Sequence, residues 1–97
     1  MQIIYSPKSK TELENIHDYL IENFGSRIAS EKIDMIRDDI TRLSCDPFFG
    51  RLIVDGIRKL NSGMSMIIYE VQEKYIEIHH VVDCRTDWAR TLFPKEI

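Results

Sequence analysis

The residues of this chain that could do acid–base chemistry gather near the end of its last apolar stretch. His79 and His80 stand side by side there. An imidazole titrates near neutral pH, so either ring could act as a general acid or base. Alternation along a strand turns neighbouring side chains to opposite faces of a sheet. The ordinary interpretation, which stays open beside the catalytic one, is one hydrogen-bonded core or edge histidine and one solvated strand residue.

A second set of residues follows directly after this stretch. Arg85 could contact a phosphate or a partner's carboxylate, or form a local ion pair with Asp87, which contributes little when exposed. Trp88, Leu92 and Phe93 share one face of a helical turn. This face either docks on the core or anchors a partner, because aromatic residues dominate interface energetics.

The composition indicates one ordinary globular domain. The 97 residues are 43% hydrophobic and 30% charged, which suits a single core. Residues 1–50 hold six Lys/Arg against nine Asp/Glu, whereas residues 51–97 hold seven of each. A nucleic-acid binder usually has a basic excess somewhere, since phosphate neutralisation supplies most of its affinity. The charge pattern therefore weakens an RNA- or DNA-binding function.

Several features set expectations about compartment and cofactors. The chain has no apolar run of membrane-spanning length and no signal segment, so we expect a soluble cytoplasmic protein. Cys45 and Cys84 are far apart, and we expect two partly buried, unpaired thiols. There is no glycine-rich phosphate loop and no His/Cys cluster, so we expect no cofactor and no metal.

Two amphipathic helices are predicted after a short first strand at residues 2–5. Ser6-Pro7 is a helix start, with serine as the N-cap and proline at the first helical position. Gly25 is placed to end this helix in a left-handed cap, Ser26 to start the next, and Asp46-Pro47 to end it. The buried stripes are expected to be Leu13, Ile16, Leu20, Ile21 and Phe24 in the first helix and Ala29, Ile33, Ile36, Ile40 and Leu43 in the second.

Three strands are predicted in the second half, at residues 57–60, 64–71 and 75–82, while residues 48–55 remain unassigned. The blurred alternation of the middle run indicates a central strand buried on both faces. The predicted architecture is α+β, with the order β-α-α-β-β-β, a two-helix hairpin on a mostly antiparallel four-stranded sheet, and a C-terminal tail or short helix.

Four short motifs in this order resemble the RelE/ParE superfamily of bacterial type II toxins. They are Arg58-Lys59-Leu60, Ile67-Ile68-Tyr69-Glu70-Val71, Ile76-Glu77-Ile78-His79-His80-Val81-Val82 and Arg85-Thr86-Asp87-Trp88. The resemblance spans nearly the whole chain and implies the same fold. One branch of the superfamily cleaves messenger RNA in the ribosomal A site, and the ParE branch poisons DNA gyrase.

The resemblance also implies where a nuclease would hold its substrate. Lys59, with Arg58 beside it, and Arg85 match basic positions of the nuclease pattern. Met66 falls where that pattern has an arginine and Thr91 falls near its terminal acid–base residue, so the phosphate clamp and the proton donor are both lost.

We therefore expect a ParE-like toxin of the plasmid-stabilisation type, neutralised by a cognate antitoxin and acting without catalysis on an essential target, DNA gyrase. The expected target- or antitoxin-binding residues are Arg85, Asp87, Trp88, Leu92 and Phe93. One alternative is a ribosome-dependent mRNA endoribonuclease, and another is a non-toxic binding module on the same fold. The nuclease candidates are Arg58, Lys59, His79, His80 and Arg85.

Overall fold

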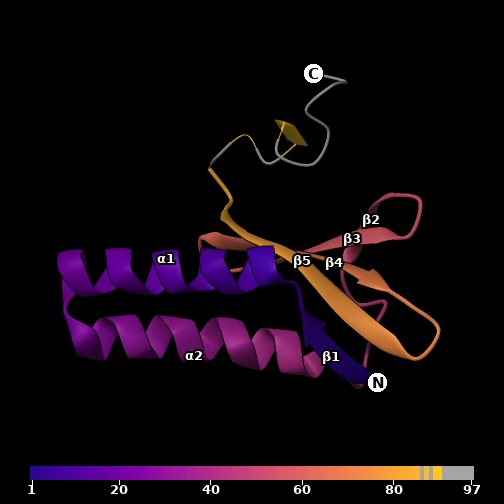
Figure 1. The fold of residues 1–97 in the computed structure, drawn as a ribbon, viewed down its shortest axis with the longest axis horizontal. Helices are drawn as coiled ribbons and strands as arrows, with labels where there is room; N and C mark the ends of the chain where they lie inside the picture. The colour runs from indigo at the N-terminus through magenta and orange to yellow at the C-terminus, as the bar shows by residue number, and fades with distance from the viewer. Residues whose placement is uncertain (86, 88, 91–97) are drawn as a thin grey trace.

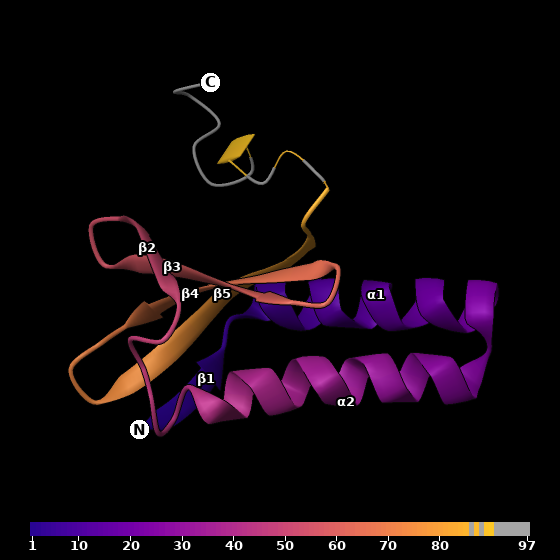
Figure 2. The same cartoon turned by 180° about the vertical axis from the view of Figure 1, so that it is seen from behind.

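A computed structural model describes residues 1–85, 87, 89 and 90 of the chain, which form a helical layer and a sheet. The elements are β1 (Gln2–Tyr5), α1 (Pro7–Phe24), α2 (Ser26–Arg42), β2 (Arg51–Val54), β3 (Ile57–Ser62), β4 (Ser65–Val71) and β5 (Tyr75–Asp83). The two helices lie side by side and antiparallel, and their connection projects beyond the sheet (Figures 1 and 2). The predicted α+β class is confirmed.

The sheet has five strands in the order β1-β5-β4-β3-β2, so the prediction of four strands was wrong. β1 pairs with β5 in parallel, and the other pairs are antiparallel. The additional strand is β2, from the unassigned stretch 48–55. It is short, lies at the sheet edge and pairs irregularly between Leu52 and Val54, which removes the alternation that marks longer strands. The sequence does contain one signal for the β2–β3 hairpin, the two-residue connection Asp55-Gly56, in which Gly56 has a φ of 77°.

The first helix begins as predicted. Ser6 is the N-cap, its Oγ accepts a hydrogen bond from the Ser9 N–H at 3.0 Å, and Pro7 is the first helical residue. Ser6 also ties the helix to the sheet, since its N–H donates to the Ile78 carbonyl and its Oγ donates to the His79 carbonyl, both at 3.0 Å. The start of α1 is thus fixed at the point where β1 leaves β5.

The helix connection and the end of α2 differ in detail from the prediction. Gly25 has the expected positive φ of 87°, but its ψ of 168° lies outside the left-handed helical region. Gly25 itself is the N-cap of α2, and Ser26 is its first residue. The helix ends at Arg42, before Asp46-Pro47, because residues 43–45 close as a tight turn.

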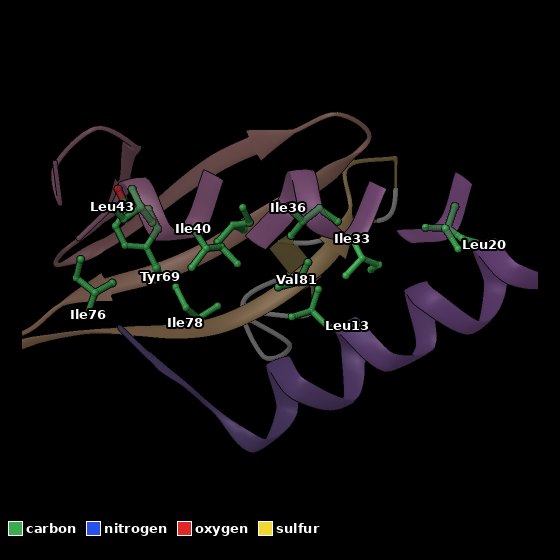
Figure 3. Close-up of a cluster of buried hydrophobic side chains, with 12 residues drawn as sticks. Leu13, Leu20, Ile33, Ile36, Ile40, Leu43, Tyr69, Ile76, Ile78 and Val81 are labelled. Atoms are coloured by element: carbon green, nitrogen blue, oxygen red, sulfur yellow. The ribbon is translucent and has the colours of Figure 1, made fainter. Parts of the chain in front are cut away.

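The core lies between the helical hairpin and one face of the sheet, where side chains of both layers point toward one another (Figure 3). We call this the helix face of the sheet. Strand β4 is buried on both faces, as predicted, from Met66 to Tyr69. Ile67 and Tyr69 belong to the helix-face core. Alternation places Met66, Ile68 and Glu70 on the other side, which we call the outer face.

The predicted stripe of α1 is correct only for part of its length. Leu13 and Leu20 are buried, whereas Ile21 and Phe24 are exposed. Phe24 lies at the projecting end of the hairpin, beyond the sheet that would have covered it (Figure 1). Cys45 and Cys84 are free thiols, and Cys45 is exposed where partial burial was expected. Neither helix of the described chain has the length and hydropathy that a membrane crossing requires.

Candidate functional site

An apolar groove of about 600 Å³ lies where the projecting half of the helical hairpin meets the β3–β4 turn and the end of β5. Helix α1 contributes Tyr19 and Phe24, α2 contributes Met35, and the turn contributes Met64. Each of these side chains is at least 39% exposed. Unpaired aromatic and methionine side chains gathered in one hollow are typical of surfaces that bind a protein partner.

Arg85 lines the same groove, but its charge is already engaged. Its Nε and Nη2 donate to the two carboxylate oxygens of Asp83 at 3.0 and 2.6 Å, and its backbone N–H donates to Asp83 at 2.8 Å. These hydrogen bonds lower the pKa of Asp83 to about 2. Of the alternatives for Arg85, the structure has a local ion pair, but with Asp83, and Asp87 pairs with Arg90. Arg85 therefore ties down the end of β5 through Asp83 at the edge of the groove.

Arg58 serves the loop before β2. Its guanidinium donates to the Gly50 carbonyl at 2.9 Å and lies 5.0 Å above the Phe48 ring. The hydroxyl of Tyr69 holds the same loop, accepting from the Gly50 N–H at 2.8 Å and donating to the Pro47 carbonyl at 2.9 Å. Burial raises the pKa of Tyr69, so this hydroxyl stays protonated. The structure gives Arg58 the role of holding the loop before β2.

The outer face contains the other residues of the predicted nuclease set. Lys59 pairs with Ile68 across the β3–β4 ladder, so it belongs to this face. Met66, where the nuclease pattern has an arginine, is only 3% exposed. On this face the described residues thus place Lys59 near the uncharged Met66, and this combination does not make a phosphate clamp.

His79 lies on the outer face between two carboxylates. A β-bulge opposite Ile68 and Tyr69 makes His79 the extra residue of β5. Its Nε2 is 3.0 Å from the Glu70 carboxylate. Glu77 lies directly opposite Glu70 in the β4–β5 register. One coordinating atom from each of these three side chains lies within 4.8 Å of the others.

His80 turns to the helical layer instead. Its Nδ1 is 3.2 Å from the carboxylate of Glu12, on the first part of α1, and the side chains of both are more than four-fifths buried. Glu12 is therefore a largely buried residue of α1 that contacts the sheet. The two histidines thus meet different partners, Glu70 for His79 and Glu12 for His80, and they do not form one site.

A second hollow, of about 680 Å³, lies between the helices near β1. Charged side chains from both helices surround it, among them Lys10, Glu14, Asp34 and Arg37. Burial raises the pKa of Tyr5, which also lines this hollow. Its charged rim distinguishes it from the apolar groove.

The predicted binding residues are only partly placed. Arg85 lies at the groove, and Asp87 pairs with Arg90. Trp88, Leu92 and Phe93 lie outside the described residues, as does Thr91, the position that differs from the nuclease pattern. Sequence reasoning missed Tyr19, Met35 and Glu70. Tyr19 and Met35 carry a detectable signal, since each is a large apolar side chain outside the buried stripe of its helix. Glu70 has no signal in the sequence that would identify it, because its partners come from another strand.

Comparison with known proteins relates this geometry to a family. Residues 3–88 match the model of the ParE toxin of the type II toxin–antitoxin system parDE. A solved chromosomal ParDE system from P. aeruginosa matches with a TM-score of 0.77 and 22% identity over 86% of this chain and 95% of that one. A YoeB/ParE toxin from Agrobacterium tumefaciens matches with a TM-score of 0.60 and 15% identity over 86% and 98%. Comparison with curated protein sequences finds no significant match.

Proposed function

The chain belongs to the ParE toxin family of type II toxin–antitoxin systems, and we propose that it arrests growth as a binding poison of DNA gyrase. In this proposal a cognate antitoxin neutralises it, and no bond of a substrate is broken. The proposal rests on the family and on the uncharged Met66 at a position where the nuclease pattern has an arginine.

The main support for a binding function, rather than a nuclease one, comes from the residues of the outer face. A ribonuclease needs cations around the phosphate as negative charge develops in the transition state. Here the arginine position is the buried Met66, which offers no charge to a phosphate. Arg58 holds the β2 loop and Arg85 is paired with Asp83. Without an arginine at the Met66 position a phosphodiester lacks that part of its clamp, which favours the binding function over the nuclease one.

The apolar groove supplies a surface for the antitoxin. Tyr19, Phe24, Met35 and Met64 offer apolar contact area, and Lys32 adds a positive charge at the same groove. An amphipathic antitoxin segment with apolar side chains and flanking carboxylates fits this combination. The matched ParDE structure from P. aeruginosa is itself described as a toxin–antitoxin system, which supports a protein antitoxin as the occupant.

The test is a pair of assays with the purified chain. In the first, the chain is added to gyrase and relaxed plasmid, and loss of supercoiling or accumulation of cleaved plasmid is measured. In the second, it is added to ribosomes programmed with a defined message, and cleavage is read by primer extension. The proposal requires inhibition in the first assay and an intact message in the second. Cleaved message with unaffected gyrase would contradict it.

The second candidate function, a RelE-type endoribonuclease, has one observation in its favour. His79 shares the outer face with Lys59, and its hydrogen bond to Glu70 fixes its ring as a general acid or base would require. If the ribosome assay shows cleavage, His79→Gln should abolish it and His80→Gln should leave it, because His80 faces Glu12 on the helical side.

A further inference from the structure

Three potential metal ligands lie together on the outer face, away from the apolar groove. Glu70 comes from the end of β4, and Glu77 and His79 come from β5. All three residues are half-buried, and their coordinating atoms lie within 4.8 Å of one another. Bonds of roughly 2.0–2.2 Å around a tetrahedral ion would set these atoms about 3.4 Å apart. Binding would therefore draw the three ligand atoms closer together, and the side-chain torsions of the two glutamates are the bonds that can rotate to do so.

The pairing of β4 with β5 places two of these carboxylates opposite each other, which is unfavourable unless a cation is present. Glu70 and Glu77 are directly opposed across the antiparallel ladder, where like charges destabilise a sheet. Among the residues that the structure describes, no lysine or arginine forms a salt bridge with either carboxylate. The hydrogen bond from His79 reaches Glu70, while Glu77 has no hydrogen-bond partner within the described residues. One imidazole therefore faces two carboxylates.

We propose that Glu70, Glu77 and His79 bind one divalent transition-metal ion, of which zinc is the best fit. The imidazole nitrogen favours zinc and its neighbours over magnesium and calcium, which prefer all-oxygen sites. Two carboxylates and one neutral imidazole provide three protein ligands and neutralise the double positive charge of the ion. A fourth position stays open to water or to a partner's side chain. This site is independent of the proposed action on gyrase.

The bulge explains why the ligands converge. It gives β5 an extra residue at His79, opposite the junction of Ile68 and Tyr69. Bulges change the aim of side chains and occur often at functional sites. Glu77 and His79 share one face because they are two residues apart, and the hairpin brings Glu70 opposite Glu77. Two strands thus present a site for which the sequence has no contiguous motif.

Cobalt(II) is the probe, because it substitutes for zinc and its visible absorption reports coordination by protein ligands. The purified, untagged chain with Cys45→Ser and Cys84→Ser is titrated with cobalt(II), and bound cobalt is then displaced with zinc. We expect visible bands that saturate at one ion per chain and disappear when zinc is added. In that background, Glu77→Gln and His79→Gln should each weaken binding by at least about tenfold.

Glu77→Gln is the decisive variant, since it leaves the hydrogen bond between His79 and Glu70 in place and so preserves the fold, which circular dichroism verifies. His17→Gln, on α1, is the matched control and should bind like the parent. The proposal is overturned if no bands form, if Glu77→Gln binds as tightly as the parent, or if His17→Gln removes the bands.

Discussion

The carboxylate of Glu12 on α1 accepts a hydrogen bond from the backbone N–H of Val81 on β5 at 3.1 Å. Strand β1 ends at Tyr5, which pairs with Ile78, so within the described part of the chain no strand borders the edge of β5 beyond that point. A side chain of the helix takes the place of a strand there. Unpaired strand edges recruit other chains, so this contact both positions α1 and protects the sheet edge.

Replacing Glu12 with alanine should destabilise the fold. It leaves the Val81 N–H without its partner in a half-buried place, and such a loss costs about 1–3 kcal/mol. Urea unfolding measures the change. Glu14→Ala, two residues away on an exposed position of the same helix, should change stability by less than about 0.5 kcal/mol. Equal effects of the two substitutions would show that the contact to β5 contributes nothing.

Tyr69→Phe should loosen the loop before β2. The substitution removes the hydroxyl that accepts from the Gly50 N–H and donates to the Pro47 carbonyl, and we expect a loss of about 1–3 kcal/mol. Thermal unfolding gives the stability, and hydrogen exchange of the Gly50 amide gives the local effect. Tyr19→Phe, which removes an exposed hydroxyl from the groove, is the control. An unchanged exchange rate at Gly50 would contradict this role of Tyr69.

The pair of Asp83 and Arg85 should make stability depend on pH only in acid. The folded pKa of Asp83, about 2, lies below its usual value of 3.8, so the stabilisation is fully present above pH 3.8 and is lost as the pH falls toward 2. The effect is small, because the pair is exposed to solvent. Comparing parent and Asp83→Asn by denaturation from pH 7 to pH 2 isolates it: the stability difference should be constant near neutrality and shrink below pH 4. A difference that grows in acid would have the wrong sign.

Phe24 should be important for antitoxin binding although it lies outside the core. Phe24→Ala removes a 57% exposed ring from the groove, and loss of an interface anchor costs about 2 kcal/mol, or roughly thirtyfold in Kd. Calorimetric titration with the cognate antitoxin measures it. Phe49→Ala removes a ring of similar exposure, 64%, that does not line the groove, and should bind normally. If the two variants bind equally well, the antitoxin lies elsewhere.

Local sequence signals predicted the elements that local chemistry determines. Ser6-Pro7 set the start of α1, and alternation blurred by burial on both faces marked β4 as central. β2 was missed because a four-residue edge strand with irregular pairing has no period to detect. Phe24 was assigned to the core because its spacing continues the stripe, although the sheet does not extend that far.

The candidate site was less predictable for a different reason. Arg58 and Arg85 were identified as cations, but their charges are engaged by the Gly50 carbonyl and by Asp83, which only the folded chain reveals. Glu12 and Glu70 were overlooked because each acts on a histidine distant in sequence or on another strand. Contacts between elements decide these roles, and the spacing within one element does not encode them.

The most direct test of the central claim follows synthesis in cells during the first minutes after this chain is induced alone. DNA and protein synthesis are pulse-labelled in parallel, with uninduced cells as the reference. A gyrase poison predicts that DNA synthesis falls first, with a DNA-damage response, while protein synthesis continues. Early loss of protein synthesis with continuing DNA synthesis would contradict the account and would place the activity on the outer face, at Lys59 and His79.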